Sequence, residues 1–176
     1  MIDFSRNYFE LFGLPQRFGC DPALLEDAYR RLQTEVHPDR YASASEQQKR
    51  MALQSSARVN EAYRALKDPV ARAQYLLSLN GVDALTETDT KLPPEFLERQ
   101  LERREAAAEA IAGHDSESVA RIIADVRNEA NDLVGALVHA LDDEGAFGAA
   151  RMPVRELKFL AKLADDLDAM QSSLDD

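Results

Sequence analysis

Apolar residues recur at helical spacing along almost the whole chain, and this periodicity constrains the fold more than any other feature. Alternating β-branched stretches, which would indicate strands, are missing from the sequence. Proline and glycine divide the helical pattern into segments. Pro38 is the clearest break, because a proline disfavours helical geometry at the residue before it, here His37. The pattern therefore predicts an all-α protein.

The first part of the chain is predicted to form four helices, two of which flank the tripeptide His37-Pro38-Asp39. Residues 37–43 form a short loop between these two helices, so the helices should pack antiparallel. The predicted helices are a short one from Asn7 to Leu11, a second that starts at an Asp21 cap followed by Pro22 and ends before Pro38, a third from about Ser45 to Leu66, and a fourth from Asp68-Pro69 to Asn80-Gly81.

The apolar stripes on these helices predict the core of this part of the chain. Tyr8, Phe9 and Phe12 are expected to be core residues rather than a ligand site. The stripe of the second helix comprises Leu24, Leu25, Ala28, Tyr29, Leu32 and Val36, and that of the third comprises Ser55, Val59, Ala62, Tyr63 and Leu66.

A polar, threonine-rich stretch predicts a linker at residues 81–92, between a first domain at 1–80 and a second at 93–176. The second domain is expected to be a three-helix bundle, because its helices are joined by short turns. Its predicted helices run from Pro93-Pro94 to about Ala112, from a cap at Asp115 or Ser116 to about Leu141, and from Pro153, at the first helical position, towards the C-terminus.

Charge is divided unevenly between the two parts. Residues 1–75 carry 11 Lys and Arg against 10 Asp and Glu, whereas residues 76–176 carry 10 against 22. A near-neutral first part and a strongly acidic second part indicate two modules with different surfaces. The acidic part argues against nucleic acid as a partner, because phosphates would be repelled. Acidic charge also favours solubility, which is the simpler explanation for many of these residues.

Several kinds of site and location are disfavoured by the composition. No apolar run approaches the roughly 20 residues of a membrane-spanning helix, and the N-terminus lacks the pattern of a signal peptide. Cys20 is the only cysteine, so an internal disulfide or a cysteine-based metal site is excluded. It is expected to be a passive thiol, although a nearby helix start could lower its pKa. His114 and His139 lack ligand-like spacing, so we predict no metal and no cofactor.

Six motifs in order resemble the HscB family, the J-type co-chaperones of iron–sulfur cluster assembly. RAQYLLSLNG is the most specific of them, since ordinary J-domains lack this segment. The motifs are YFELFGLP at residues 8–15, HPDRYAS at 37–43, QSSA at 54–57, RAQYLLSLNG at 72–81, FLERQLERRE at 96–105 and LKFL at 157–160.

The resemblance implies a fold and a function. It implies an N-terminal J-domain, a helical hairpin with the His-Pro-Asp loop, joined to the C-terminal bundle in an L-shaped two-domain arrangement. It further implies a cytoplasmic co-chaperone without catalytic activity, which takes part in protein complex assembly. Such a protein binds the cluster scaffold IscU, delivers it to the DnaK-type chaperone HscA and stimulates the HscA ATPase.

By resemblance, the J-domain contacts the chaperone through the His-Pro-Asp loop and nearby basic residues. Proline fixes the loop, which lowers the entropic cost of presenting two polar side chains. Basic residues would favour approach to an acidic chaperone surface. Without the family motifs, the tripeptide would be a surface turn and the arginines ordinary solvated charge. The implied chaperone-binding residues are His37, Pro38, Asp39, Arg30, Arg31 and Arg40.

The implied scaffold-binding residues lie in the second domain. At about 100° per residue, two leucines and three glutamates of the first bundle helix share a face opposite its core side. A small apolar centre with a charged rim is typical of a reversible interface. The alternative is that its apolar members belong to the bundle core, and Glu98 departs from the apolar residue often found there in the family. The residues are Leu97, Glu98, Leu101, Glu102, Glu105 and Phe159.

Two other functions are compatible with the tripeptide. A general J-protein would present unfolded clients to a DnaK-type chaperone, but such proteins usually have peptide-binding grooves or glycine-rich segments, and neither is visible in this sequence. A hydrolase could use His37 and Asp39 as an acid–base pair, but no nucleophile, metal site or phosphate loop accompanies them.

Overall fold

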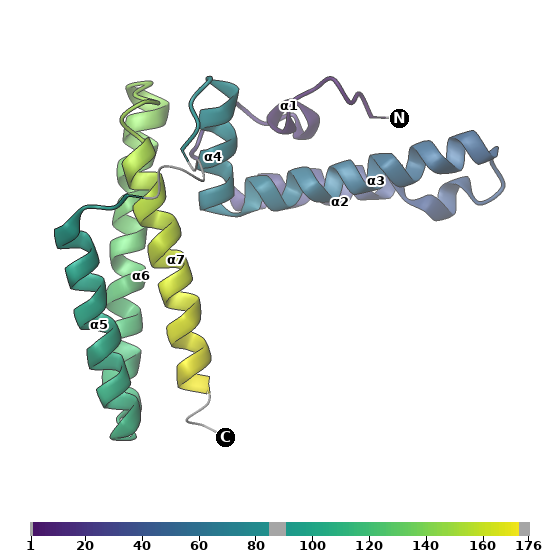
Figure 1. Ribbon diagram of the computed structural model, residues 1–176. Helices are drawn as coiled ribbons and strands as arrows, with labels where there is room; N and C mark the ends of the chain where they lie inside the picture. Colours follow the sequence, from purple (N-terminus) through teal and green to yellow (C-terminus); the bar gives the residue numbers. More distant parts are fainter. Residues whose placement is uncertain (1, 85–90, 173–176) are drawn as a thin grey trace. The chain divides into compact units, whose positions relative to one another are not determined.

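The computed structural model describes residues 2–84 and 91–172, except for the side chain of Pro38. All regular structure in these residues is helical, as predicted, and Figure 1 shows the order of the elements. They are α1 (Tyr8–Phe12), α2 (Pro22–Val36), the 3₁₀ turn η1 (Pro38–Tyr41), α3 (Glu46–Lys67), α4 (Pro69–Leu79), α5 (Pro94–Ala112), α6 (Ser116–Val138), the π turn η2 (His139–Asp143) and α7 (Arg151–Ser172).

The chain divides into two compact units, Met1–Leu79 and Asn80–Asp176. The first unit contains α1 to α4, and its two long helices, α2 and α3, lie side by side and antiparallel (Figure 1). The short connection between α2 and α3 contains η1, where a loop was predicted.

Side-chain caps explain where the helices of the first unit begin. Asn7 and Ser45 each form a capping box, in which the side chain accepts a hydrogen bond from the backbone three residues on. Asp21 caps α2 by accepting a hydrogen bond from the backbone of Ala23. Gly13 ends α1 in the left-handed conformation, at φ 67°. The predicted starts therefore agree with the structure to within a residue.

The core of the first unit forms where the stripes of its helices meet. Tyr8, Phe9 and Phe12 are buried, as predicted. Leu24 is an exception to the predicted stripe, because its side chain is 56% exposed. Leu25, the next residue, fills the buried position on α2 instead. An assignment from apolar character alone does not separate Leu24 from Leu25, since single exposed leucines are common on protein surfaces.

Arg72 joins three backbone segments of the first unit from a buried position. Its Nε donates to the carbonyl oxygen of Phe18 at 2.8 Å, and its Nη1 donates to that of Leu66 at 2.7 Å. The Leu66 carbonyl lies in the last turn of α3, where backbone acceptors have no partner within the helix. The first residue of the RAQYLLSLNG motif thus has a structural role in the turn between α3 and α4.

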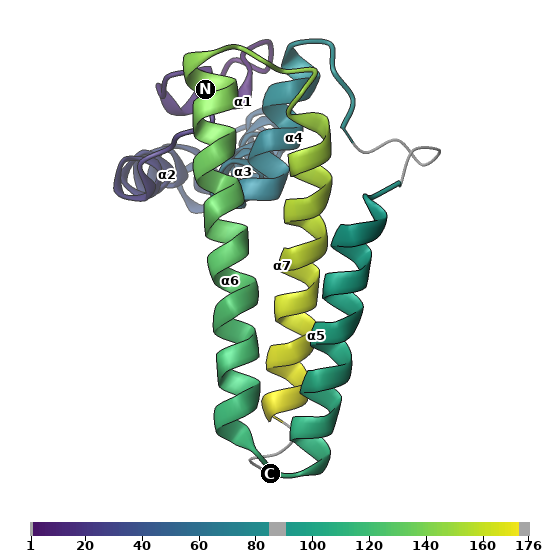
Figure 2. The same ribbon diagram turned by 90° about the vertical axis from the view of Figure 1, so that its left-hand side faces the viewer.

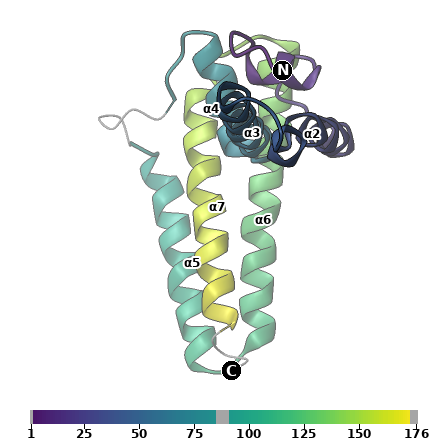
Figure 3. The ribbon, with the colours of Figure 1, turned by 90° about the vertical axis from the view of Figure 1, so that its right-hand side faces the viewer.

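The second unit contains a three-helix bundle of α5, α6 and α7, as predicted (Figures 2 and 3). Helices α5 and α7 run in the same direction, and α6 runs opposite to both. Its main apolar core is built from residues of all three helices: Phe96, Ala107, Val119, Ile123, Val126, Leu160, Leu163 and Leu167.

Two features at the ends of the bundle differ from the sequence-based expectation. Helix α7 begins at Arg151, so Pro153 is its third residue rather than its first. The first-turn N–H groups have no partner within a helix, so a proline is tolerated throughout that turn and does not identify the first position. Helix α6 continues into the π turn η2, which the apolar pattern did not indicate.

The segment that follows α4 is attached to α7 within the second unit. Ala84 is buried, and its carbonyl oxygen accepts a hydrogen bond from Nε of Arg155 at 2.8 Å. Arg155 is itself buried. Part of the predicted linker, residues 85–90, lies outside the described residues.

Candidate partner-binding sites

The tripeptide His37-Pro38-Asp39 lies at the junction of α2 and η1, where it is held by short-range hydrogen bonds. His37 caps η1, because its Nδ1 accepts a hydrogen bond from the backbone N–H of Asp39 at 3.3 Å. The backbone N–H of Arg40 donates to the carbonyl oxygen of His37 at 3.1 Å. An imidazole that accepts at Nδ1 carries its proton on Nε2 in the neutral form, so Nε2 is available as a donor.

The two polar side chains of this turn are presented to solvent. The side chain of His37 is 57% exposed and that of Asp39 is 90% exposed. In the described part of the chain, no lysine or arginine forms an ion pair with Asp39, whose carboxylate lies 3.6 Å from Nδ1 of His37. The side chain of Pro38 lies outside the described residues. The Asp39 carboxylate is therefore free to accept a charge-assisted hydrogen bond from a partner.

The three predicted basic residues have different environments. Arg40 donates from Nη1 to the carbonyl oxygen of Thr34 at 3.2 Å, which holds it beside the last turn of α2. Arg30 is paired with Glu26 at 3.3 Å. Arg31 is exposed and has no side-chain partner among the described residues. A shallow hollow lined by Gln33, Thr34, His37 and Arg40 lies beside the turn.

Glu26 is a residue of this region that the sequence analysis did not single out. It accepts hydrogen bonds from the hydroxyl of Tyr63 on α3 and from Nε of Arg30. The bond from Tyr63, followed by that from Arg30, holds the pKa of its carboxyl below the ordinary value. The four-residue spacing of Glu26 and Arg30 could have indicated their ion pair. The pair leaves Arg31 and Arg40 as the better candidates for long-range attraction of an acidic partner.

The second predicted surface lies on α5. Leu97 is 42% exposed and Leu101 is 58% exposed, so neither belongs to the bundle core. The three predicted glutamates are also exposed, and no hydrogen bond or ion pair engages their side chains in the described residues. We call this set the docking face: Leu97, Glu98, Leu101, Glu102 and Glu105 on α5, with Phe159 on α7.

Phe159 differs from the two leucines because it is partly buried. Its ring packs against the apolar core of the bundle and meets the ring of Phe96 edge to face, with 5.6 Å between centroids. Phe96 lies in the first turn of α5, directly before Leu97. The structure therefore brings Phe159 to the level of the docking face, with part of its ring in the core.

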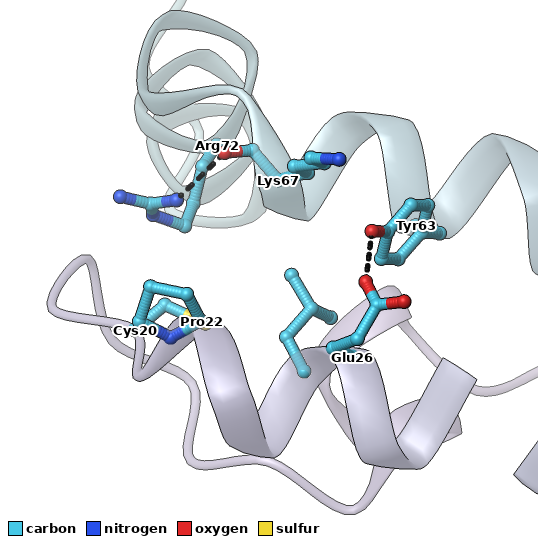
Figure 4. A pocket seen from close by; sticks show the side chains of 7 residues that line it. Cys20, Pro22, Glu26, Tyr63, Lys67 and Arg72 are labelled. Atoms are coloured by element: carbon cyan, nitrogen blue, oxygen red, sulfur yellow. Dashed lines mark hydrogen bonds between the residues drawn. The ribbon is translucent and has the colours of Figure 1, made fainter. Parts of the chain in front are cut away.

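Cys20 lies at a small pocket of about 100 Å³ in the first unit. Figure 4 shows Cys20 and Pro22 on one side of the pocket, Arg72 and Lys67 on another, and the hydrogen bond from Tyr63 to Glu26 at its edge. Burial, the largest effect, raises the pKa of the Cys20 thiol although Arg72 acts in the opposite direction. The net shift is upward, which disfavours the reactive thiolate form of Cys20.

Within residues 2–84 and 91–172, no group of three or more His, Cys, Asp and Glu side chains is arranged to hold a metal ion. His139 is engaged instead by carboxylates of its own turn, with Nδ1 at 3.0 Å from Asp143 and Nε2 at 3.3 Å from Glu144. None of the helices in these residues has the length and apolar character needed to cross a membrane.

Each of the two units matches a known family. Residues 7–75 match the DnaJ domain, and residues 92–168 match the domain described as the HSCB C-terminal oligomerisation domain. The sequence is 43% identical to the co-chaperone protein HscB homolog of Azoarcus sp. (strain BH72), over 99% of this chain and 98% of that protein. The chain belongs to the HscB family of co-chaperones. Its two functional candidates fall in different matches, with the tripeptide in the DnaJ domain and the docking face in the HSCB domain.

Other HscB proteins agree with this assignment. The HscB homolog of Burkholderia vietnamiensis (strain G4 / LMG 22486) is also 43% identical, over 99% of each chain. The structure of chaperone HscB from Vibrio cholerae has 38% identity and a TM-score of 0.86, and the match covers 96% of this chain and 99% of that one. Human co-chaperone HscB has 27% identity and a TM-score of 0.87, covering 96% and 83%. The HscB family and the J-domain, which the motifs predicted, are confirmed. The all-helical fold, which the apolar periodicity predicted, is also confirmed.

Proposed function

We propose that this chain is a co-chaperone of iron–sulfur cluster assembly that binds the scaffold protein IscU and delivers it to HscA, whose ATPase it stimulates. In this proposal it catalyses no reaction, acts in the cytoplasm and has no nucleic-acid or membrane partner. The J-domain comprises residues 1–80, a linker follows at 81–92, and residues 93–176 form the scaffold-binding domain. The proposal is supported by membership of the HscB family and by the two separate candidate surfaces described above.

The docking face carries the scaffold-binding part of the proposal. Two exposed leucines lie among three exposed glutamates that have no partner among the described residues. An exposed apolar pair is unfavourable in water, and carboxylates without partners attract a cationic surface. Both properties are met by a partner that covers the leucines and brings lysines or arginines to the rim. The face is small, which suits a complex that must later dissociate.

The His-Pro-Asp turn carries the chaperone-binding part. It offers HscA an exposed carboxylate on Asp39 and a donor at Nε2 of His37, on a backbone that is held by the hydrogen bonds of η1. Because the turn is held before binding, little conformational entropy is lost when it docks. A single chain that binds IscU at one domain and HscA at the other raises the effective concentration of each partner near the other. Hydrolysis then fixes HscA on the delivered scaffold.

The test is an HscA ATPase assay with this protein, with and without IscU. Synergistic stimulation supports scaffold delivery, whereas stimulation that does not respond to IscU supports a general J-domain co-chaperone presenting unfolded clients. No stimulation contradicts both functions. The combined variant Leu97→Ala, Leu101→Ala and Phe159→Ala should lose the IscU-dependent part and keep the IscU-independent part.

A matched control tests whether the loss of IscU affinity is specific to the docking face or follows from removing any two exposed leucines. Leu24→Ala with Leu53→Ala removes two leucines that are 56% and 63% exposed in the first unit, and should leave IscU affinity unchanged. Chemical unfolding provides the second control. The double variant Leu97→Ala with Leu101→Ala, which keeps the partly buried Phe159, should lose little stability, whereas truncation of core leucines typically costs about 2–5 kcal/mol. A loss of that size with normal IscU affinity would assign the leucines to the core.

A further inference from the structure

The apolar packing of helix α5, which carries most of the docking face, lies near its two ends, with Phe96 near the start and Ala107, Ala110 and Ile111 near the end. Its buried residues are Phe96, Gln100 and Ala107. Between the large ring of Phe96 and the small Ala107, the one buried side chain is the polar Gln100. Large interdigitating side chains normally determine how a helix is turned against its neighbours. In the middle of α5, where the buried side chain is Gln100, the contacts to the neighbouring helix are polar.

A carboxylate on α6 provides these contacts. Glu129 is paired with Nη2 of Arg99 at 3.4 Å and with Nη1 of Arg103 through a short charge-assisted bond. The side chains of Glu129 and Arg103 are each 25% exposed. Arg103 also donates to Oε1 of Gln100 at 2.9 Å. Two arginines one turn apart on α5 thus share a single acceptor, and we call this arrangement the Glu129 clamp.

The charge state of Glu129 is suited to this role. Burial would raise the pKa of its carboxyl, but the hydrogen bonds and charges of Arg103 and Arg99 outweigh burial and lower the pKa below the ordinary value. Glu129 is therefore ionised at neutral pH. Glu156 on α7 is near the same groups, and burial raises the pKa of its carboxyl. Among the described residues, the ion pairs with Arg99 and Arg103 are made by Glu129, so the clamp is assigned to Glu129.

The clamp also extends to the aromatic pair at the docking face. The guanidinium of Arg99 lies 5.8 Å from the ring centroid of Phe96. Phe96 in turn meets Phe159 of α7 edge to face at 5.6 Å. A continuous set of contacts therefore connects α6, α5 and α7, the three helices that Figure 2 shows side by side.

Helical geometry connects the clamp to the exposure of the leucines. At about 100° per residue, Leu97 and Leu101 lie about 120–160° around α5 from Arg99 and Arg103. When the two arginines are held against α6, the leucines must face away from α6. We infer that Glu129 is a positioning residue for the docking face, which acts through Arg99 and Arg103 to hold Leu97 and Leu101 in line with Phe159. This inference rests on the proposed binding of IscU at that face.

The experiment compares Glu129→Gln with Asp168→Asn in the full-length protein. Asp168 forms the ion pair Arg127–Asp168 at 2.5 Å between α6 and α7, and neither residue belongs to the docking face or the clamp. Each substitution removes one carboxylate from an interhelical pair, so the two variants are matched in charge. We expect Glu129→Gln to raise the Kd for purified IscU about tenfold. Asp168→Asn should change this Kd by less than about twofold.

Two further measurements separate positioning from a loss of stability. Glu129→Asp keeps the charge and should bind IscU more tightly than Glu129→Gln. Stimulation of HscA in the absence of IscU should be the same for all three variants and the unchanged protein, because the His-Pro-Asp turn is untouched. Urea unfolding measures the stability of Glu129→Gln and Asp168→Asn. For a positioning role, the two variants should differ in IscU affinity by more than their difference in stability explains.

The outcomes distinguish this inference from the proposed function. If Glu129→Gln and Asp168→Asn affect IscU affinity equally, or if Glu129→Asp binds as weakly as Glu129→Gln, the positioning role is wrong. If the combined alanine variant of Leu97, Leu101 and Phe159 binds IscU normally, the docking face itself is wrong. If that alanine variant loses IscU binding while Glu129→Gln and Asp168→Asn bind IscU with equal affinity, only the positioning role is wrong.

Discussion

The two candidate binding surfaces of this protein are built in opposite ways. The His-Pro-Asp turn is polar and is held by bonds among residues that are neighbours in the sequence. The docking face is an apolar pair with an acidic rim, and it joins side chains of α5 and α7 that are aligned by contacts with α6. A short motif suffices to specify the first surface, whereas the second depends on how three helices are packed.

This difference determines how each surface should fail. Substitutions in the turn should act on the turn alone, because its supporting bonds span only a few residues. The docking face should respond both to its own residues and to residues that touch no partner, such as Glu129. If a substitution in the turn alters IscU affinity, or if residues that touch no partner do not affect the docking face, the two surfaces are not supported differently.

The largest expected effect is that of His37→Gln. The turn loses the imidazole that caps η1 through Nδ1 and offers a donor at Nε2, so stimulation of the HscA ATPase should be abolished. The fold should remain intact, because the side chain is 57% exposed. Circular dichroism and IscU affinity should be unchanged, and the ATPase assay is the measurement.

His114→Gln is the matched control for this prediction. His114 is also exposed but lies in the second unit, at the turn between α5 and α6. It should leave stimulation unchanged. Normal stimulation by a folded His37→Gln protein would show that the turn does not trigger hydrolysis, and the proposed division of labour between the two surfaces would fail.

The sequence predicts local features of this protein better than tertiary ones. The helix starts predicted near Asn7, at the Asp21 cap and near Ser45 agree with the structure, because a cap and the backbone N–H that it accepts from are neighbours in the chain. Pro153 misplaces one start by two residues, because every position of the first turn tolerates proline. Leu24 shows that apolar character alone does not assign a side chain to the core.

The contacts that sequence reasoning missed are those between distant residues. Arg72 donates to the backbone carbonyl of Phe18, and Arg155 donates to that of Ala84. Because every residue has a backbone carbonyl, the sequence does not show which carbonyl an arginine binds. The exposure of Leu97 and Leu101 followed from helical spacing, but the Glu129 clamp did not. Many glutamates could pair with an arginine of α5, and only the packing of α6 selects one.

A smaller effect is expected from the acidic rim. The combined variant Glu98→Gln, Glu102→Gln and Glu105→Gln should slow association with IscU about tenfold at low ionic strength, because exposed charges act mainly on the association rate. The difference from the unchanged protein should shrink at about 1 M salt, where the screening length falls to about 3 Å. Stopped-flow measurements over a salt series test this. Such behaviour would show that the rim attracts the partner while the leucines retain it.

A variant with equal charge controls for the overall field of the acidic domain. Asp125→Asn, Asp132→Asn and Asp165→Asn remove the same number of negative charges from exposed positions on α6 and α7. If this variant slows association as much as the rim variant, then total charge and not the docking face governs the approach of IscU.

The smallest effect is expected from His139, whose ring meets two carboxylates at the end of α6. The hydrogen bond with Asp143, followed by the charge of Glu144, raises the pKa of His139 above its ordinary value of 6.5. Because the folded-state pKa is the higher one, this stabilisation is complete below about pH 6.5 and is lost as the pH rises through the folded value.

His139→Gln should remove this dependence, so urea unfolding of the two proteins should differ most near pH 5.5 and converge towards pH 8.5. HscA stimulation should not change at any of these pH values, since the turn that contains His37 lies in the other unit. Unfolding curves that keep the same separation from about pH 5.5 to about pH 8.5 would rule out stabilisation by protonated His139 beside Asp143 and Glu144. A pH-dependent loss of stimulation in His139→Gln would instead show that the two regions are less independent than their supporting contacts indicate.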